Sequence, residues 1–117
     1  MKVYALYNCD TCRKALKHLE KSKREFELKA IRETPPSLPE LRAMLKIYDG
    51  EIGKLFNTGG KDYRDMKLGE KLKAMNPETA LGLLAKNGNL VKRPFVLAGN
   101  TGMVGFRIDE WKRKGFR

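Results

Sequence analysis

The sequence has little cysteine, a single histidine and no long apolar run. Two cysteines among 117 residues argue against a secreted scaffold held together by several disulfides. No apolar run approaches the ~20 residues that a membrane-spanning helix needs, and the first residues lack the apolar core of a secretory signal. We therefore expect a cytoplasmic protein that does not bind membranes. In a reducing compartment, two cysteines close in sequence indicate a reactive or metal-binding pair more than a structural disulfide.

Acidic residues are also scarce relative to basic ones. The chain has 25 lysines and arginines against 14 aspartates and glutamates, a formal net charge of +11. Such an excess favours anionic partners, whether oxyanions, phosphates, acidic protein surfaces or nucleic acid. The sequence contains neither a recognisable nucleic-acid-binding module nor basic residues interleaved with stacking aromatics, so direct nucleic-acid binding is not expected.

What the sequence does have is the composition of one globular domain. Its 41% hydrophobic and 33% charged residues are well mixed, which is typical of a folded protein. A chain of this length can bury roughly two-thirds of its unfolded surface. We therefore expect a single, monomeric domain over residues 1–117, with a core that needs no metal or disulfide.

The first thirty residues predict a strand, a helix and a second strand. Residues 3–7 (VYALY) are short, apolar and β-prone, and residues 26–31 (FELKAI) alternate apolar with polar side chains. Between them, Ala15, Leu16 and Leu19 recur at helical spacing after a polar turn. A unit of this size normally pairs its two strands in parallel through a right-handed crossover.

The middle of the chain, residues 35–88, predicts a helical insertion. It opens with two prolines, and Ser37 with Glu40 forms a capping box. Asn76-Pro77 is a helix start and Asn87-Gly88 a helix end. The expected helical segments are residues 38–48, 52–56, 63–73 and 77–86.

The last third predicts a hairpin and a closing helix. Strands are expected at residues 90–97 and 103–106, with a turn at 100–102 between them. Residues 108–114 form a basic helix with Trp111 on its apolar side. The predicted fold is α/β, a thioredoxin-like four-stranded mixed sheet with a helical insertion between the βαβ unit and the C-terminal ββα unit.

The two cysteines stand three residues apart where the first strand passes into the first helix. Cys9 lies just before the helix, near its unpaired backbone N–H groups and the positive end of its dipole. Arg13 and Lys14 add positive charge. A thiolate there can have a pKa well below the free value of ~8.5. Cys9 is therefore the candidate nucleophile, and Cys12, one turn into the helix, the candidate resolving thiol.

Other interpretations of these residues stay open at this point. A zinc site would need two further ligands, and the only histidine is His18. The cysteines could also be small buried apolar side chains. Arg93 could simply end a strand and point to water, and Pro94 would place that strand at a sheet edge or follow a cis peptide bond.

Four segments together resemble the arsenate reductase-like (ArsC/Spx/YffB) family of thioredoxin-fold proteins, over nearly the whole chain. They are residues 7–15 (YNCDTCRKA), 56–64 (FNTGGKDYR), 90–94 (LVKRP) and 104–106 (VGF). The resemblance implies a cis Arg93–Pro94 bond, a nucleophilic Cys9 and an oxyanion-binding Arg93. It implies a redox-active Cys9–Cys12 disulfide, no metal or bound cofactor, and glutathione, thioredoxin or glutaredoxin as reductant. The residues expected to bind the small anionic or thiol substrate are Thr11, Arg13, Asn57, Arg93, Pro94 and Arg107.

The chain also departs from the arsenate-reducing members of this family. They carry an arginine where this chain has Asn57, and Arg107 matches a third arginine only with a one-residue offset. They usually lack the second cysteine. The pattern is closer to an uncharacterised reductase-like branch. The first hypothesis is therefore a thiol–disulfide oxidoreductase that could also reduce an oxyanion such as arsenate.

The second hypothesis is a redox-sensing transcriptional regulator. Spx proteins share the C-x-x-C pair and bind the RNA polymerase α subunit. The basic surface and Gly50 or Gly53 near the inserted helices agree with that role. The short segment after Trp111 differs from the longer tail typical of Spx proteins, and this difference ranks the regulator second.

Overall fold

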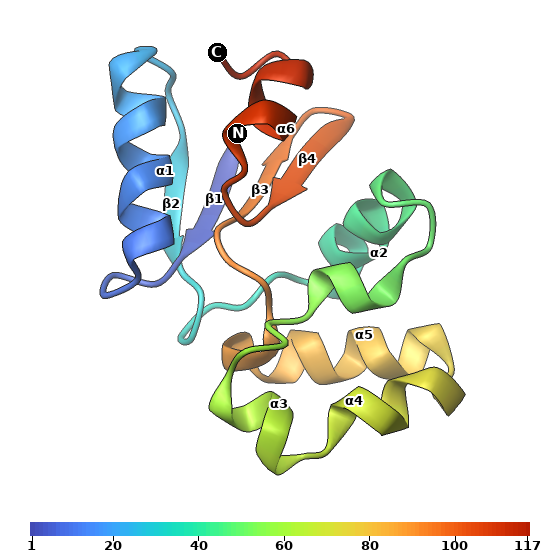
Figure 1. Ribbon diagram of the computed structural model, residues 1–117. Helices are drawn as coiled ribbons and strands as arrows, with labels where there is room; N and C mark the ends of the chain where they lie inside the picture. Colours follow the sequence, from blue (N-terminus) through green and yellow to red (C-terminus); the bar gives the residue numbers. More distant parts are fainter.

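A four-stranded mixed sheet forms the centre of the computed structural model, which describes residues 1–117 (Figure 1). The strand order is β2-β1-β3-β4. β1 (Lys2–Ala5) pairs in parallel with β2 (Glu27–Ala30) and antiparallel with β3 (Phe95–Ala98), and β4 (Thr101–Val104) runs antiparallel to β3. The thioredoxin-like α/β fold predicted from the sequence is confirmed.

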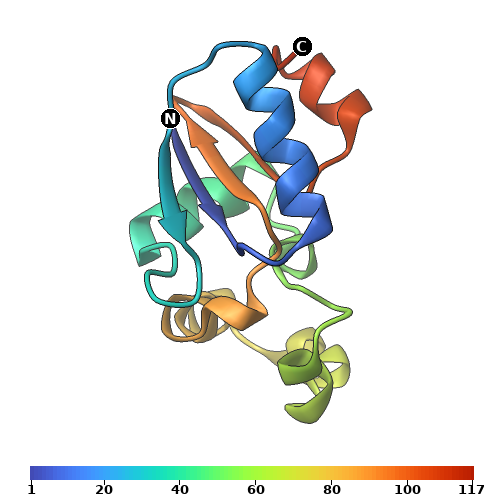
Figure 2. The ribbon, with the colours of Figure 1, turned by 90° about the vertical axis from the view of Figure 1, so that its left-hand side faces the viewer.

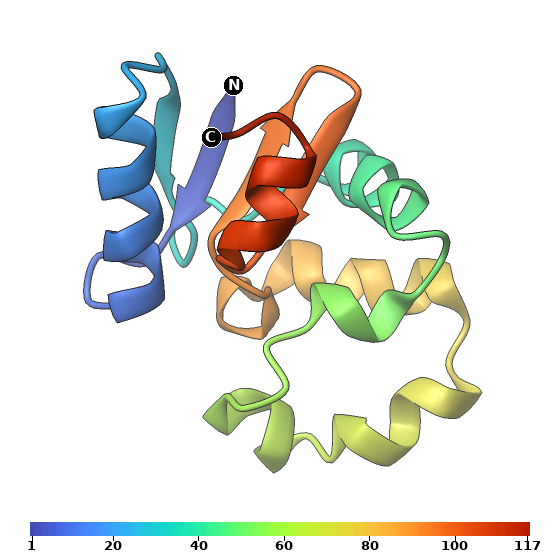
Figure 3. The same ribbon diagram turned by 45° about the horizontal axis from the view of Figure 1, so that its top comes forward.

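Helices cover both faces of this sheet because neighbouring strand residues point in opposite directions. Val3 and Ala5 face α1 (Asp10–Lys21) and α6 (Ile108–Arg113), which lie on one face (Figure 2). Tyr4 faces the other side, where it joins a larger core with α2 (Leu38–Ile47) and α5 (Pro77–Lys86). Figure 3 shows α6 in front of β3 and β4, beside α1. Each face of β1 therefore contributes to a separate apolar core.

The helix starts predicted in the middle segment are confirmed. Ser37 caps α2 with the full capping box, accepting the backbone N–H of Glu40 at 3.3 Å while the Glu40 side chain accepts the Ser37 N–H at 2.9 Å. Asn76 caps α5 by accepting the N–H of Glu78 at 2.8 Å. The predicted short turn is the 3-10 helix η1 (Ile52–Leu55).

The single helix expected at residues 63–73 is wrong. The structure has three short pieces instead: α3 (Lys61–Asp65), α4 (Leu68–Lys71) and the 3-10 helix η2 (Leu72–Ala74). Lys67 interrupts them because its φ of 53° lies in the left-handed region, which no α-helix can continue through. Leu68 is nevertheless buried in the core.

The strand expected at residues 90–97 is also too long. Leu90, its first predicted residue, ends the 3-10 helix η3 (Gly88–Leu90). Val91 makes only an isolated bridge with Phe56, and β3 begins at Phe95. The Arg93–Pro94 peptide bond is cis, as the family resemblance implied. Pro94 has no N–H to donate to a ladder, so the regular strand starts after it.

The turn of the hairpin lies earlier than predicted. Residues 99–100 form the turn, and Gly102 already pairs with Leu97 inside the β3–β4 ladder. Gly102 is required there, because a Cβ would lie 2.6 Å from the Val96 carbonyl oxygen.

β2 is the outer strand beside β1, and its Leu28 is 55% exposed.

Candidate active site

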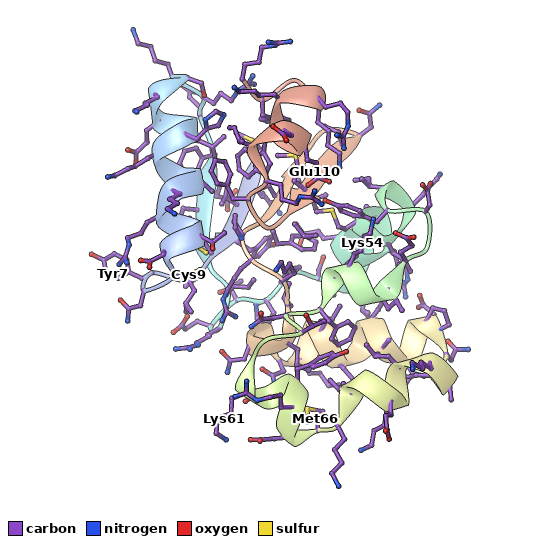
Figure 4. The ribbon with its side chains drawn as sticks, in the orientation of Figure 1. Tyr7, Cys9, Lys54, Lys61, Met66 and Glu110 are labelled. Carbon is purple, nitrogen blue, oxygen red and sulfur yellow. The ribbon has the colours of Figure 1, made fainter.

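Cys9 is the N-cap residue of α1. Its backbone is extended (φ −98°, ψ 121°), and its Sγ accepts the backbone N–H of Cys12 at 3.4 Å. A sulfur in this position meets N–H groups that the helix itself leaves unpaired. Figure 4 places Cys9 at the end of α1 where β1 arrives, with Tyr7 further out in the same turn. The cysteine therefore lies where the predicted β-turn-α junction put it.

The surroundings of Cys9 favour its thiolate. Burial raises the pKa of the Cys9 thiol, but four interactions oppose burial: hydrogen bonds from the backbone and side chain of Cys12, the charge of Arg93 and the backbone N–H of Thr11. Together they outweigh it, so the pKa of Cys9 lies below its ordinary value. Cys9 is partly exposed, so a reagent can reach it.

Cys12 has the opposite character. It is fully buried on the inner face of α1, and burial raises the pKa of its thiol to about 12. The backbone N–H of Leu6 points at its Sγ from 3.5 Å and lowers the pKa, while the hydrogen bond and charge of Cys9 raise it. Both cysteines are free thiols in this structure. Cys9 is thus accessible and has a lowered pKa, whereas Cys12 is enclosed and has a raised one.

A cavity of about 350 Å³ opens beside Cys9, and we call it the thiol cavity. Its lining contributes three cations, Lys92, Arg93 and Arg107, and no acidic side chain. None of the three takes part in an ion pair. The lining residues are Cys9, Thr11, Asn57, Lys92, Arg93, Val104, Gly105, Phe106 and Arg107. An anion in this cavity would meet uncompensated positive charge next to a sulfur nucleophile.

The fold brings most of the sequence-predicted residues together here. Thr11, Asn57, Arg93 and Arg107 line the thiol cavity with Cys9, although they come from four separate stretches of the chain. Pro94 is buried and does not line the cavity, but its cis bond follows Arg93 directly. The Arg93 guanidinium also reaches the Asn89 carbonyl oxygen at 3.5 Å.

Arg13 lies elsewhere. Its guanidinium pairs with the Asp10 carboxylate on the exposed side of α1, and it lines a different, largely apolar cavity with Tyr7 and Leu28. The structure does not bring Arg13 to the thiol cavity, since its guanidinium is paired with Asp10 on the exposed side of α1.

Four lining residues were not among the predicted site residues: Lys92, Val104, Gly105 and Phe106. Lys92 stands directly before the predicted Arg93, and its side chain approaches Gly105, where an added Cβ would lie 3.2 Å from Lys92 Cε. The Phe106 ring packs edge-on against Trp111 with 4.9 Å between ring centres. All four residues belong to the segments 90–94 and 104–106 that carry the family resemblance, and this was the signal that could have found them.

His18 takes no part in the thiol cavity. Its Nε2 lies 2.8 Å from the Phe116 carbonyl oxygen, and its ring packs against Phe106 and Trp111. Nowhere do three histidine, cysteine, aspartate or glutamate side chains gather in a way that could hold a metal ion. None of the helices has the length and apolar character needed to cross a membrane.

Sequence comparison decides the family. Residues 4–114 match the ArsC family. The chain belongs to it. The uncharacterised protein YusI of Bacillus subtilis is 42% identical over 104 residues, which cover 89% of this chain and 88% of YusI. The match to the ArsC family therefore includes both the cysteine pair and the Arg93–Pro94 segment.

Two further ArsC-like relatives differ in what their names say. A crystal structure of a possible arsenate reductase from Streptococcus mutans superposes with a TM-score of 0.86 at 30% identity, covering 95% of this chain and 96% of that one. The global transcriptional regulator Spx 1 of Oceanobacillus iheyensis is 28% identical over 111 residues, covering 95% of this chain and 83% of the regulator. The proteins similar to this chain thus include one named for catalysis and one named for regulation.

Proposed function

We propose that this ArsC-family protein is a thiol–disulfide oxidoreductase in which Cys9 attacks, Cys12 resolves and Arg93 binds an anionic part of the substrate. The observation that carries the proposal is the pair of unlike thiols: Cys9 accessible with a lowered pKa, Cys12 buried with a raised one. Lys92, Arg93 and the turn around Thr11 supply the positive surroundings that an anionic substrate needs.

The first chemical step is attack on a substrate disulfide. The Cys9 thiolate forms a bond to one sulfur, the substrate S–S bond breaks, and the leaving thiolate takes a proton from water. The product is a mixed disulfide on Cys9. The cations around the cavity offset the repulsion between an anionic substrate and the attacking sulfur.

The second step follows from the environment of Cys12. Once Cys9 is in a mixed disulfide, it carries no negative charge and no longer accepts the Cys12 hydrogen, so two causes of the raised pKa of Cys12 disappear. Cys12 Sγ then attacks Cys9 Sγ, the mixed disulfide bond breaks, and the proton of Cys12 passes to the departing substrate thiolate. Two electrons have passed to the substrate, and the pair is left as a disulfide. Glutathione, or the dithiol of thioredoxin or glutaredoxin, reduces the pair again.

The same cavity fits a tetrahedral oxyanion, and reduction of one such as arsenate is the finer form of the proposal. Its support is the possible arsenate reductase from Streptococcus mutans and the three unpaired cations of the cavity. Asn57 stands in the lining as a neutral side chain. We therefore expect a disulfide to be the better substrate. An oxyanion concentrates more than one negative charge on a single group and needs more positive charge around it than a disulfide does.

Replacing each cysteine separately tests this mechanism. Cys9→Ser removes the nucleophile and is expected to lower the rate at which dithiothreitol reduces hydroxyethyl disulfide to the rate measured without protein. Cys12→Ser keeps the nucleophile but not the resolving thiol, so a mixed disulfide on Cys9 should accumulate and be visible in the intact mass. Normal turnover by Cys9→Ser contradicts the proposal.

A redox-sensing regulator is the second candidate, because Spx 1 of Oceanobacillus iheyensis matches over 95% of this chain. In that case the two thiols serve as a switch rather than a catalyst, and the partner would be the RNA polymerase α subunit. Purified α subunit passed over the immobilised protein should then be retained in one redox state more than in the other. Equal absence of retention in both states removes this candidate.

A further inference from the structure

A second cavity of about 240 Å³ adjoins the thiol cavity, and we call it the distal cavity. Lys92, Val104 and Arg107 line both cavities, so their side chains form the common wall. Lys54 on η1 and Glu110 on α6 line only the distal cavity. Figure 4 shows these two side chains on the side of the molecule between η1 and α6, away from Cys9.

Positive charge dominates the distal cavity. Its lining contributes Lys54, Lys92 and Arg107 against the single carboxylate of Glu110. Glu110 is already engaged, because Lys114 Nζ, outside the cavity, lies 3.5 Å away and the hydroxyl of Tyr48, a lining residue, donates to it at 2.9 Å. An anion is therefore the ligand that the remaining charge favours.

Lys54 is the cation that distinguishes the distal cavity from the thiol cavity. Its Nζ lies 5.6 Å from the centre of the Tyr48 ring, and its ion pair with Glu51, at 2.8 Å, is more than half exposed on both sides. Exposed pairs of this kind contribute little, so Lys54 can exchange Glu51 for a ligand at small cost. Lys92 and Arg107 have no ion-pair partner to give up.

We propose that the two cavities together bind one small disulfide whose thiols carry carboxylates. This inference rests on the proposed oxidoreductase function and names its substrate class. One substrate sulfur lies at Cys9 and exchanges as described above, while a carboxylate, which does not react, lies in the distal cavity at Lys54. Lys92 and Arg107 stand between the two ends of such a substrate, where they favour its negative charge over a neutral or positive one.

Three disulfides of similar size and different charge test the inference: dithiodipropionate with two carboxylates, neutral hydroxyethyl disulfide and cystamine with two ammonium groups. With dithiothreitol as reductant, kcat/KM is expected to be highest for dithiodipropionate and lowest for cystamine. Lys54→Gln should lower the ratio of kcat/KM for dithiodipropionate to that for hydroxyethyl disulfide about threefold.

Lys73→Gln is the matched control, because Lys73 is exposed, has no ion-pair partner and lines neither cavity. It should leave that ratio as it is in the unchanged protein. A ratio that Lys54→Gln does not move, or that Lys73→Gln moves as much, overturns the distal site.

A second measurement needs no turnover. Thiodipropionate, a thioether that cannot be reduced, should slow the alkylation of Cys9 by iodoacetamide, and its neutral analogue thiodiglycol should not. Lys54→Gln should weaken this protection. Loss of turnover with all three disulfides while protection persists refutes the oxidoreductase function alone, whereas absence of protection in the unchanged protein refutes the distal site.

Discussion

At the scale of single residues, the two cysteines differ more than their spacing suggests. The Cys9 sulfur caps α1 and accepts a backbone N–H. The Cys12 sulfur, three positions further along, is enclosed in the core. The helix start explains part of the lowered pKa of Cys9, and Arg93 explains another part from a distant stretch of the chain. The pKa of the Cys9 thiol is thus lowered both by neighbours in sequence and by a residue from a distant stretch of the chain.

Replacing Arg93 tests the long-range part. Arg93→Gln removes a charge that lowers the pKa of Cys9, so that pKa should rise and the alkylation of Cys9 by iodoacetamide should set in at higher pH. The rate of alkylation against pH measures this. Arg113→Gln, which changes the same charge at an exposed position on α6, is the control. An Arg93→Gln profile that coincides with the control profile contradicts the assignment of Arg93.

The thiol cavity could be predicted from the sequence only in part. Cys9, Thr11 and Arg93 were identified from the C-x-x-C pair and the family segments, and all three line the thiol cavity. Arg13 was placed there as well, from the segment that carries the family resemblance. In the structure its guanidinium pairs instead with Asp10, three residues earlier on the same helix.

At the scale of elements, the capped helices were predicted well and the loops between them poorly. Two helices begin with local capping hydrogen bonds, at Ser37 and at Asn76 before Pro77. These residue types are recognisable as helix starts in the sequence itself. The break at Lys67 has no such signal, since lysine rarely adopts a left-handed conformation. β3 starts late because Pro94 has no N–H to donate to the ladder, so the regular strand begins only at Phe95.

Gly88 joins two elements that are far apart in sequence. A Cβ there would lie 1.9 Å from the carbonyl oxygen of Ile31 and 2.7 Å from its carbonyl carbon, both backbone atoms that cannot move aside cheaply. Gly88→Ala is therefore expected to lower the free energy of unfolding by roughly 2–4 kcal/mol, measured by urea denaturation.

Gly82 provides the matched control. It lies inside α5, and a Cβ there meets nothing within 4 Å. Gly82→Ala should raise the free energy of unfolding by about 0.5–1 kcal/mol, because alanine is the better helix former. Equal effects of the two substitutions would show that the contact with Ile31 is not tight.

At the scale of the whole molecule, Glu40 ties the inserted helices to the sheet. Its carboxylate accepts the Tyr4 hydroxyl of β1 at 2.6 Å, the Ser37 N–H at 2.9 Å and the Lys2 ammonium at 3.3 Å. Burial raises the pKa of Glu40, and these hydrogen bonds lower it further than burial raises it. The folded state therefore has the lower pKa.

The sign of the pH dependence follows from that. A carboxyl whose pKa is depressed by folding stabilises the protein above its unfolded pKa of ~4.3, and this contribution is lost as the pH falls through the folded value. Glu40→Gln should cost about 1–2 kcal/mol of unfolding free energy at neutral pH. The gap between the variant and the unchanged protein should narrow as the pH is lowered through the acid range.

Urea denaturation at several pH values measures this gap, with the exposed Glu33→Gln as control. A gap of constant size would mean that the Glu40 charge contributes nothing. The contact itself was outside the reach of sequence reasoning: the capping box predicted Glu40 toward Ser37, but not that Tyr4 and Lys2 lie within reach of the same carboxylate.

Trp111 is the only tryptophan of the chain, and its indole is fully buried. Its N–H donates to the Gly105 carbonyl oxygen at 3.1 Å, and Gly105 and Phe106 both line the thiol cavity. The indole is therefore an optical probe that hydrogen-bonds directly to a residue in the wall of the cavity beside Cys9. Intrinsic fluorescence excited at the indole alone is expected to follow ligand uptake and thiol oxidation in real time, without a dye, a tag or any added chromophore.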